Sequence, residues 1–168
     1  RLTGDDPAAI YGRTAAVMTA RGWTVTREII EGETNGYTTT DGTRRIVVDA
    51  RLAPAQAAKT MLHEAAHALV HAADTLTAED RRDLHRGRME VEAESVAYVL
   101  AGILGLDTAA YSVGYVAGWA NGDTTAVADT ASAVLATVHE LADALDHTDT
   151  DTADSAADDG DAAETAAA

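Results

Sequence analysis

The chain opens with a pattern that predicts a helix. Over residues 7–22, apolar side chains such as Ile10, Val17 and Met18 recur at helical spacing. Asp6 can cap the start of this helix, and Gly22 can end it.

Short alternating stretches then predict strands. Residues 23–29 alternate between apolar and polar, as in a half-buried strand. The Asn-Gly pair at 35–36 and the Asp-Gly pair at 41–42 are typical of tight hairpin turns, and they bracket a short strand at 37–40. With a third strand at 44–49, the pattern predicts a three-stranded antiparallel meander after the first helix.

The rest of the chain is predicted to be helical. Helix starts, apolar periodicity and glycine stops indicate a long helix from Pro54 to about His71, a short one beginning at 77–80, and further helices at 88–104, 111–120 and 124–145. A helix, a small sheet and then several helices define an α+β fold.

The end of the sequence differs in composition from the rest. Residues 146–168 hold eight acids, no Lys or Arg and no large apolar side chain. Such a segment cannot bury enough apolar surface to offset the entropy of ordering, so we expect a disordered acidic tail. The predicted domain is therefore residues 1–145, with a tail at 146–168.

Charge and composition exclude several functions. The net charge of -16 argues against direct binding of nucleic acid by this chain, which would need clustered basic residues. The single lysine, Lys59, follows no glycine-rich loop, and cysteines are absent, so phosphate loops and thiolate metal sites are excluded. The longest apolar run, 96–106, falls short of the roughly 20 residues that a membrane span needs, and we expect a cytoplasmic protein without membrane contact.

The sequence His63-Glu64-Ala-Ala-His67 lies within the long predicted helix. Histidines four residues apart lie on one helix face, one turn from each other, so both rings can reach a single ion. Glu64 is placed about 100° around the helix, where it can touch a metal-bound water. This geometry is typical of a zinc hydrolase.

A catalytic zinc needs a third protein ligand. A third histidine after a glycine would require Gly at 70 and His at 73, but the chain has Val70 and Ala73. His71 continues the histidine stripe, but three successive turns cannot easily reach one ion. We expect His71 to pack or to support a ligand.

Glutamates on the helix at 88–104 supply the other option. Glu90 and Glu94 are four residues apart and share a face, and a cation between the helices would relieve their repulsion. Either of them is a candidate third ligand. Glu92, on a different face, is expected to point to solvent.

These motifs resemble the gluzincin pattern of zinc peptidases. Within it, the chain is most similar to the zincin-like metallopeptidase domain of ArdC-type antirestriction proteins, with the ImmA/IrrE peptidases as relatives. The resemblance is carried by residues 59–71, by residues 85–98 and by Tyr115-Val-Ala-Gly-Trp119, and it spans roughly residues 7–145.

The resemblance implies a zincin-like fold and a site. His63, His67 and Glu90 would bind zinc (Zn²⁺), Glu64 would be the general base, and Glu94 would hold a ligand histidine. Such proteins usually carry an N-terminal region that binds single-stranded DNA. That region is not visible here, and because the chain does not begin with Met we expect a fragment or a trimmed product.

The expected reaction is hydrolysis of a protein or peptide substrate in an antirestriction or mobile-element context. Zinc would lower the pKa of its water to about 7, and Glu64 would take the proton and return it to the leaving amine. The developing oxyanion needs a further donor, for which Tyr98 and His85 are candidates.

Two alternative functions of the chain involve no catalysis. An acidic chain can imitate DNA and occupy a restriction enzyme, or the zinc can act as a structural clamp in an interaction module. Chelation separates the first of these from a peptidase, because a DNA mimic would survive EDTA.

Overall fold

The structure, a computed structural model, describes residues 2–71, 86–106 and 124–158, and these form an α+β fold. Four helices and a three-stranded sheet are present in this part of the chain. In chain order the elements are α1 (Ile10–Ala20), β1 (Thr24–Glu28), β2 (Gly36–Thr38), β3 (Arg45–Asp49), α2 (Pro54–Val70), α4 (Arg86–Ile103) and α6 (Thr124–Asp158).

The first helix begins later than predicted, at Ile10 rather than near Pro7, but Asp6 still binds its first turn. The Asp6 carboxylate accepts hydrogen bonds of 2.8 Å from the backbone N–H groups of Ile10 and Tyr11, which satisfies donors that the helix start leaves open. After the helix, Gly22 adopts a φ of 84°, a conformation that favours glycine.

The sheet is mixed, and the predicted antiparallel meander is wrong. Its strand order is β1-β3-β2, with β1 parallel to β3 and β2 antiparallel to β3. The reason lies in burial: Ile46, Val47 and Val48 of β3 are fully buried, so this apolar strand takes the centre. The more polar β1 and β2 take the edges.

The predicted turn at Asn35-Gly36 is also wrong. Gly36 is the first residue of β2, and a Cβ there would lie 2.7 Å from the Thr60 side chain on α2 and 2.9 Å from the carbonyl oxygen of Val47. This glycine therefore permits close packing of β2 on α2 rather than a turn. The Asp-Gly pair at 41–42 does lie in the connection between β2 and β3.

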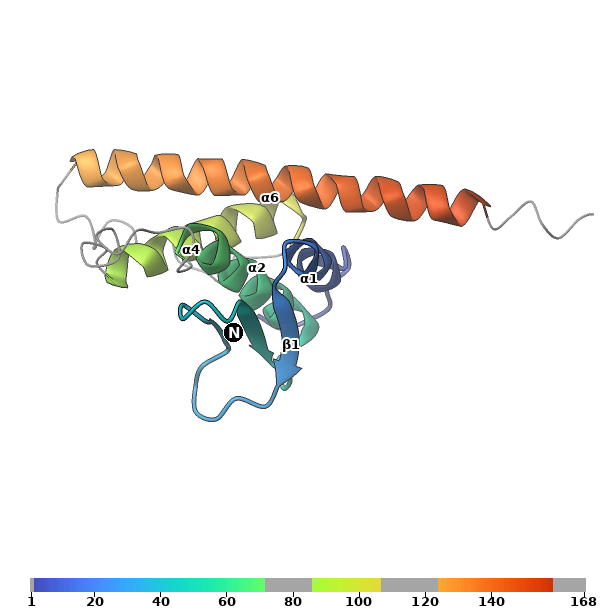
Figure 1. Ribbon diagram of the computed structural model, residues 1–168, viewed down its shortest axis with the longest axis horizontal. Helices are drawn as coiled ribbons and strands as arrows, with labels where there is room; N and C mark the ends of the chain where they lie inside the picture. The colour runs from blue at the N-terminus through green and yellow to red at the C-terminus, as the bar shows by residue number, and fades with distance from the viewer. Residues whose placement is uncertain (1, 72–85, 107–123, 159–168) are drawn as a thin grey trace, which may run out of the picture.

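Helix α2 occupies the middle of the molecule (Figure 1). It packs against β2 and β3 on one side and against α1 and α4 on others, and α6 runs along α4 and α1. Small buried side chains, including Ala58, Ala65 and Ala66, line α2 and allow its neighbours to approach closely. The site helix is thus fixed by packing along most of its length.

The predicted C-terminal end is confirmed for α4 but not for α6. Helix α4 ends at Ile103, just before Gly105, as expected. Helix α6 runs to Asp158, through the first part of the segment expected to be disordered, because no Pro or Gly interrupts it. Leu145 is the last buried residue of α6 among those whose side chains are described, and a division between domain and tail at 146 stays a prediction.

Two predicted helices, at 77–80 and 111–120, lie outside the described residues. No helix that the structure describes combines the length and the apolar character of a membrane span.

Candidate metal centre

Two histidine rings of α2 meet at one point. His63 and His67 lie one turn apart, and their Nε2 atoms are 3.1 Å from each other. Both side chains are mostly buried, and α2 is held from several sides, so the rings are presented by a rigid helix. The predicted pairing of these histidines is therefore present in the fold.

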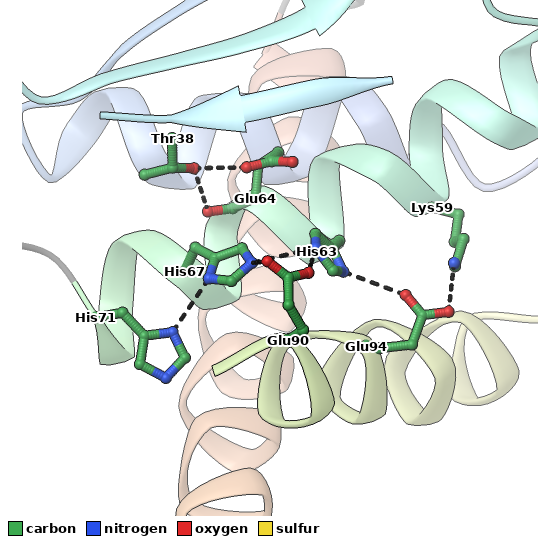
Figure 2. Close-up of polar contacts among 8 residues, drawn as sticks. All are labelled: Thr38, Lys59, His63, Glu64, His67, His71, Glu90 and Glu94. Atoms are coloured by element: carbon green, nitrogen blue, oxygen red, sulfur yellow. Dashed lines mark hydrogen bonds and ion pairs between the residues drawn. The ribbon is translucent and has the colours of Figure 1, made fainter. Parts of the chain in front are cut away.

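Helix α4 brings a carboxylate to the same point (Figure 2). One Glu90 oxygen lies 3.6 Å from His63 Nε2, and the other lies 3.8 Å from His67 Nε2. One atom from each of the three residues falls within 4.8 Å of the others. Of the two candidate glutamates, Glu90 is the one that faces both Nε2 atoms.

The geometry and chemistry of this cluster fit a zinc ion. Tetrahedral zinc with ligands at about 2.0–2.1 Å places ligand atoms about 3.3 Å apart. The two Nε2 atoms are 3.1 Å apart, close to that value, and the Glu90 carboxylate faces them with one oxygen 3.6 Å from His63 Nε2 and the other 3.8 Å from His67 Nε2. Two imidazoles and one carboxylate are also a common ligand set of catalytic zinc, which keeps a fourth position open.

Glu94 supports His63 from behind. Its Oε2 lies 3.2 Å from His63 Nδ1 (Figure 2). Its Oε1 accepts a 2.6 Å hydrogen bond from Lys59 Nζ and forms an ion pair with it. In the neutral imidazole, a carboxylate at Nδ1 holds the single proton there and leaves the Nε2 lone pair of His63 directed at His67 and Glu90. Lys59, one turn before His63 on α2, holds that carboxylate in place.

His67 has a different support. Its Nδ1 lies 3.1 Å from Nδ1 of His71, whose Nε2 lies 2.8 Å from Glu92 Oε2. Arg88 Nε donates a 2.7 Å hydrogen bond to the other oxygen of Glu92. The expectation that Glu92 points to solvent is wrong: its side chain is 3% exposed, because α4 packs against α2 and His71 is buried there.

Glu64 is buried beside the cluster and under the sheet. Thr38 of β2 donates a 2.9 Å hydrogen bond to the carboxylate Oε2, and the same hydroxyl lies 2.9 Å from the Glu64 carbonyl oxygen. Burial raises the pKa of the Glu64 carboxyl, although charge on the two histidines and the Thr38 hydrogen bond act in the opposite direction. A raised pKa suits a group that takes and returns a proton.

The metal-free cluster binds a proton tightly. Burial lowers the pKa of His63, but the contacts with the Glu90 and Glu94 carboxylates and the charge of Glu64 outweigh it and raise this pKa to about 9. The same histidines, through their hydrogen bonds, hold the pKa of Glu90 well below its usual range. Because an imidazole must give up this proton to bind a metal, a cation at the site competes with the proton on His63.

A cavity of about 210 Å³ adjoins the cluster. It lies between the start of β2 and the first part of α2, and it is lined by polar side chains together with Gly36. The lining residues are Asn35, Gly36, Gln56, Lys59, Thr60, His63, Glu64 and Glu94. The cavity gives a second molecule access to His63 and Glu64.

The two predicted oxyanion donors, Tyr98 and His85, stay predictions. Tyr98 lies on α4 with 38% exposure, and no hydrogen bond joins it to another described residue. His85 lies outside the described residues. Sequence reasoning missed Thr38, for which local sequence holds no indication, and the support role of Lys59, which continues the four-residue spacing of His63, His67 and His71.

Comparison with known proteins identifies the class of this chain. Residues 19–109 match the family described as the IrrE N-terminal-like domain, a family of peptidases. The match covers the sheet, α2 and α4, so it includes every residue of the cluster. The chain belongs to this family. No curated protein and no solved structure matches the chain.

Proposed function

We propose that this protein is a zinc-dependent peptidase that uses a metal-activated water. The observation that carries the proposal is the convergence of His63, His67 and Glu90, from two helices, on one point beside the buried carboxylate of Glu64. Family membership supports a peptidase of metal-dependent type.

In this proposal His63, His67 and Glu90 hold the ion. A bound zinc supplies a Lewis acid that polarises a carbonyl group and lowers the pKa of water to about 7. Glu64 would accept the proton of the attacking water on Oε1, since Thr38 occupies Oε2, and would return it to the leaving amine. Thr38 keeps the carboxylate oriented during both transfers, since its hydroxyl binds the Glu64 side chain and backbone together.

The substrate is proposed to be an extended peptide. Strand β2 lies at the edge of the sheet directly above Glu64, and a peptide can add to such an edge as a further strand. The cavity beside His63 would then receive a substrate side chain. The antirestriction setting, the resemblance to ArdC-type proteins and the cytoplasmic location stay predictions.

The variant Glu64→Gln tests the proposal. Zinc-loaded parent and variant are incubated with a peptide library, and new termini are counted by mass spectrometry. We expect the variant to keep one zinc per chain and to lose cleavage by a factor of about 10²–10⁴ or more, because an amide cannot accept the proton. Glu140→Gln, on the exposed side of α6, is the matched control and should cleave like the parent.

Two outcomes would contradict the proposal. If Glu64→Gln cleaves as fast as the parent, Glu64 is not the base. If the zinc-loaded parent cleaves nothing in the library and keeps its fold in EDTA, a non-catalytic binding module becomes the better interpretation.

A further inference from the structure

A line of four side chains, buried at its middle, runs away from the metal cluster. It starts at His67, passes through His71 and Glu92, and ends at Arg88, with contacts of 3.1, 2.8 and 2.7 Å. Figure 2 shows its first contact, between His67 and His71. The side chains of His71 and Glu92 are 1% and 3% exposed, so water does not replace these partners.

The donor and acceptor capacities of these groups fix which side chain donates each hydrogen bond along the line. The Arg88 guanidinium can only donate, and an ionised Glu92 can only accept. Its two oxygens have separate partners: Arg88 Nε donates to Oε1 at 2.7 Å and His71 Nε2 lies 2.8 Å from Oε2, so both oxygens of Glu92 are placed as acceptors. His71 must then carry its proton on Nε2, where Glu92 accepts it.

The direction continues to the metal cluster. With its proton on Nε2, a neutral His71 presents a lone pair at Nδ1, and His67 Nδ1 must donate to it. The remaining nitrogen of His67, Nε2, then carries a lone pair that faces His63 and Glu90. The reverse order would place a proton on His67 Nε2, in the position proposed for the metal.

We infer that His71 and Glu92 are positioning residues that set the tautomer of His67 and thereby keep its Nε2 free for the metal. This inference rests on the proposed function, because it takes His67 as a ligand. The inference gives His71 the role of linking His67 to the Glu92 carboxylate. His63 needs no such link, because the Glu94 carboxylate contacts it directly.

The isosteric variant Glu92→Gln should reverse the direction of the hydrogen bonds along this line. Arg88 needs an acceptor, so it would take the amide oxygen of Gln and turn the amide NH₂ toward His71 Nε2. His71 would then carry its proton on Nδ1 and donate to His67, which moves the His67 proton to Nε2. Zinc binding must break this order, and we expect the affinity for zinc to fall about 10–100-fold.

Removing Arg88 as well should undo the reversal. In Arg88→Leu/Glu92→Gln no donor claims the amide oxygen, so this oxygen can turn to His71 and accept from Nε2. We expect the double variant to bind zinc more tightly than Glu92→Gln, and Arg88→Leu alone to lose less affinity than the roughly 10–100-fold expected of Glu92→Gln. Glu140→Gln is again the matched control.

The experiment measures zinc affinity by competition with a chelator at pH 7.5, together with the melting temperature of each metal-free protein. A parent that binds no zinc would overturn the proposed function itself. If the parent binds but Glu92→Gln binds equally well, or if the double variant is as weak as Glu92→Gln, the positioning role is wrong. A change confined to the melting temperature likewise contradicts it.

Proton positions give a second readout that does not depend on a variant. Long-range ¹H–¹⁵N spectra of the zinc-loaded protein distinguish the two imidazole tautomers. We expect a neutral His71 with its proton on Nε2 and a His67 with its proton on Nδ1. A proton on Nδ1 of His71 would overturn the inference.

Discussion

The two histidines of the proposed metal site are supported in different ways. His63 meets the Glu94 carboxylate directly, and this carboxylate is 30% exposed and borders the cavity. His67 reaches Glu92 only through His71, and both of these side chains are almost completely buried. One site therefore combines a support that water can reach with a support that only packing maintains.

The difference shows that equal ligands need not be equally dependent on the fold. Water can replace part of the Glu94 contact, because the cavity admits it. The contacts of Glu92 and His71 have no such substitute, since unmade hydrogen bonds in the interior cost the full desolvation of the groups. We expect disturbances of the His63 side to act on metal chemistry, and disturbances of the His67 side to act on metal chemistry and stability together.

The largest expected effect comes from Glu90, which contacts both sides. Glu90→Ala removes the proposed third ligand and should weaken zinc binding by more than the 10–100-fold expected for Glu94→Ala, whose carboxylate only supports a ligand. Zinc content after dialysis and chelator competition measure both variants. If Glu94→Ala loses more zinc than Glu90→Ala, the two glutamates have exchanged roles.

The next largest effect is the pH dependence of zinc affinity, which the pKa of His63 controls. The pKa of His63 in the metal-free protein is raised to about 9, chiefly by Glu90 and Glu94 against burial. Zinc must displace this proton below pH 9, so affinity should fall about tenfold for each pH unit, or about a hundredfold from pH 9 to pH 7. Above pH 9 the dependence should level off.

Glu94→Ala provides the control for this pH dependence. Losing one of the carboxylates lowers the pKa of His63, so the levelling should move to lower pH in zinc titrations buffered by a chelator. An unchanged profile in this variant would show that Glu94 does not act on His63.

The smallest effect is a difference in stability between Glu92→Ala and Glu94→Ala. Glu92→Ala leaves the buried His71 without its acceptor and should cost about 1–3 kcal/mol in the free energy of unfolding. Glu94→Ala should cost less, since the side chain borders the cavity. Urea unfolding of the metal-free proteins measures both, and equal losses would remove the contrast between the two sides.

Local spacing in the sequence predicted much of the site. Histidines four residues apart in a helix must share a face, and so must Glu90 and Glu94, whatever surrounds them. The same rule indicated that His71 extends the stripe. The helix that begins at Pro54 and the end of α4 before Gly105 were likewise predicted from residues close in sequence.

Other features depended on contacts between distant segments. The order of the strands followed from which strand is most buried, and Gly36 looked like a turn residue until its packing on Thr60 was known. Glu92 was expected in water because it lies on a different helix face from Glu90 and Glu94. Its partners, His71 and Arg88, make burial possible, and only one of them lies on its own helix.

The sequence by itself determined which side chains can act together on each helix, because helical periodicity is a local property of the backbone. The tertiary structure alone decided that Glu90 faces both Nε2 atoms, that Thr38 holds Glu64, and that Glu92 is buried. These facts depend on how α2, α4 and β2 pack against one another. That packing is set by the shapes of many side chains at once, so no short motif encodes it.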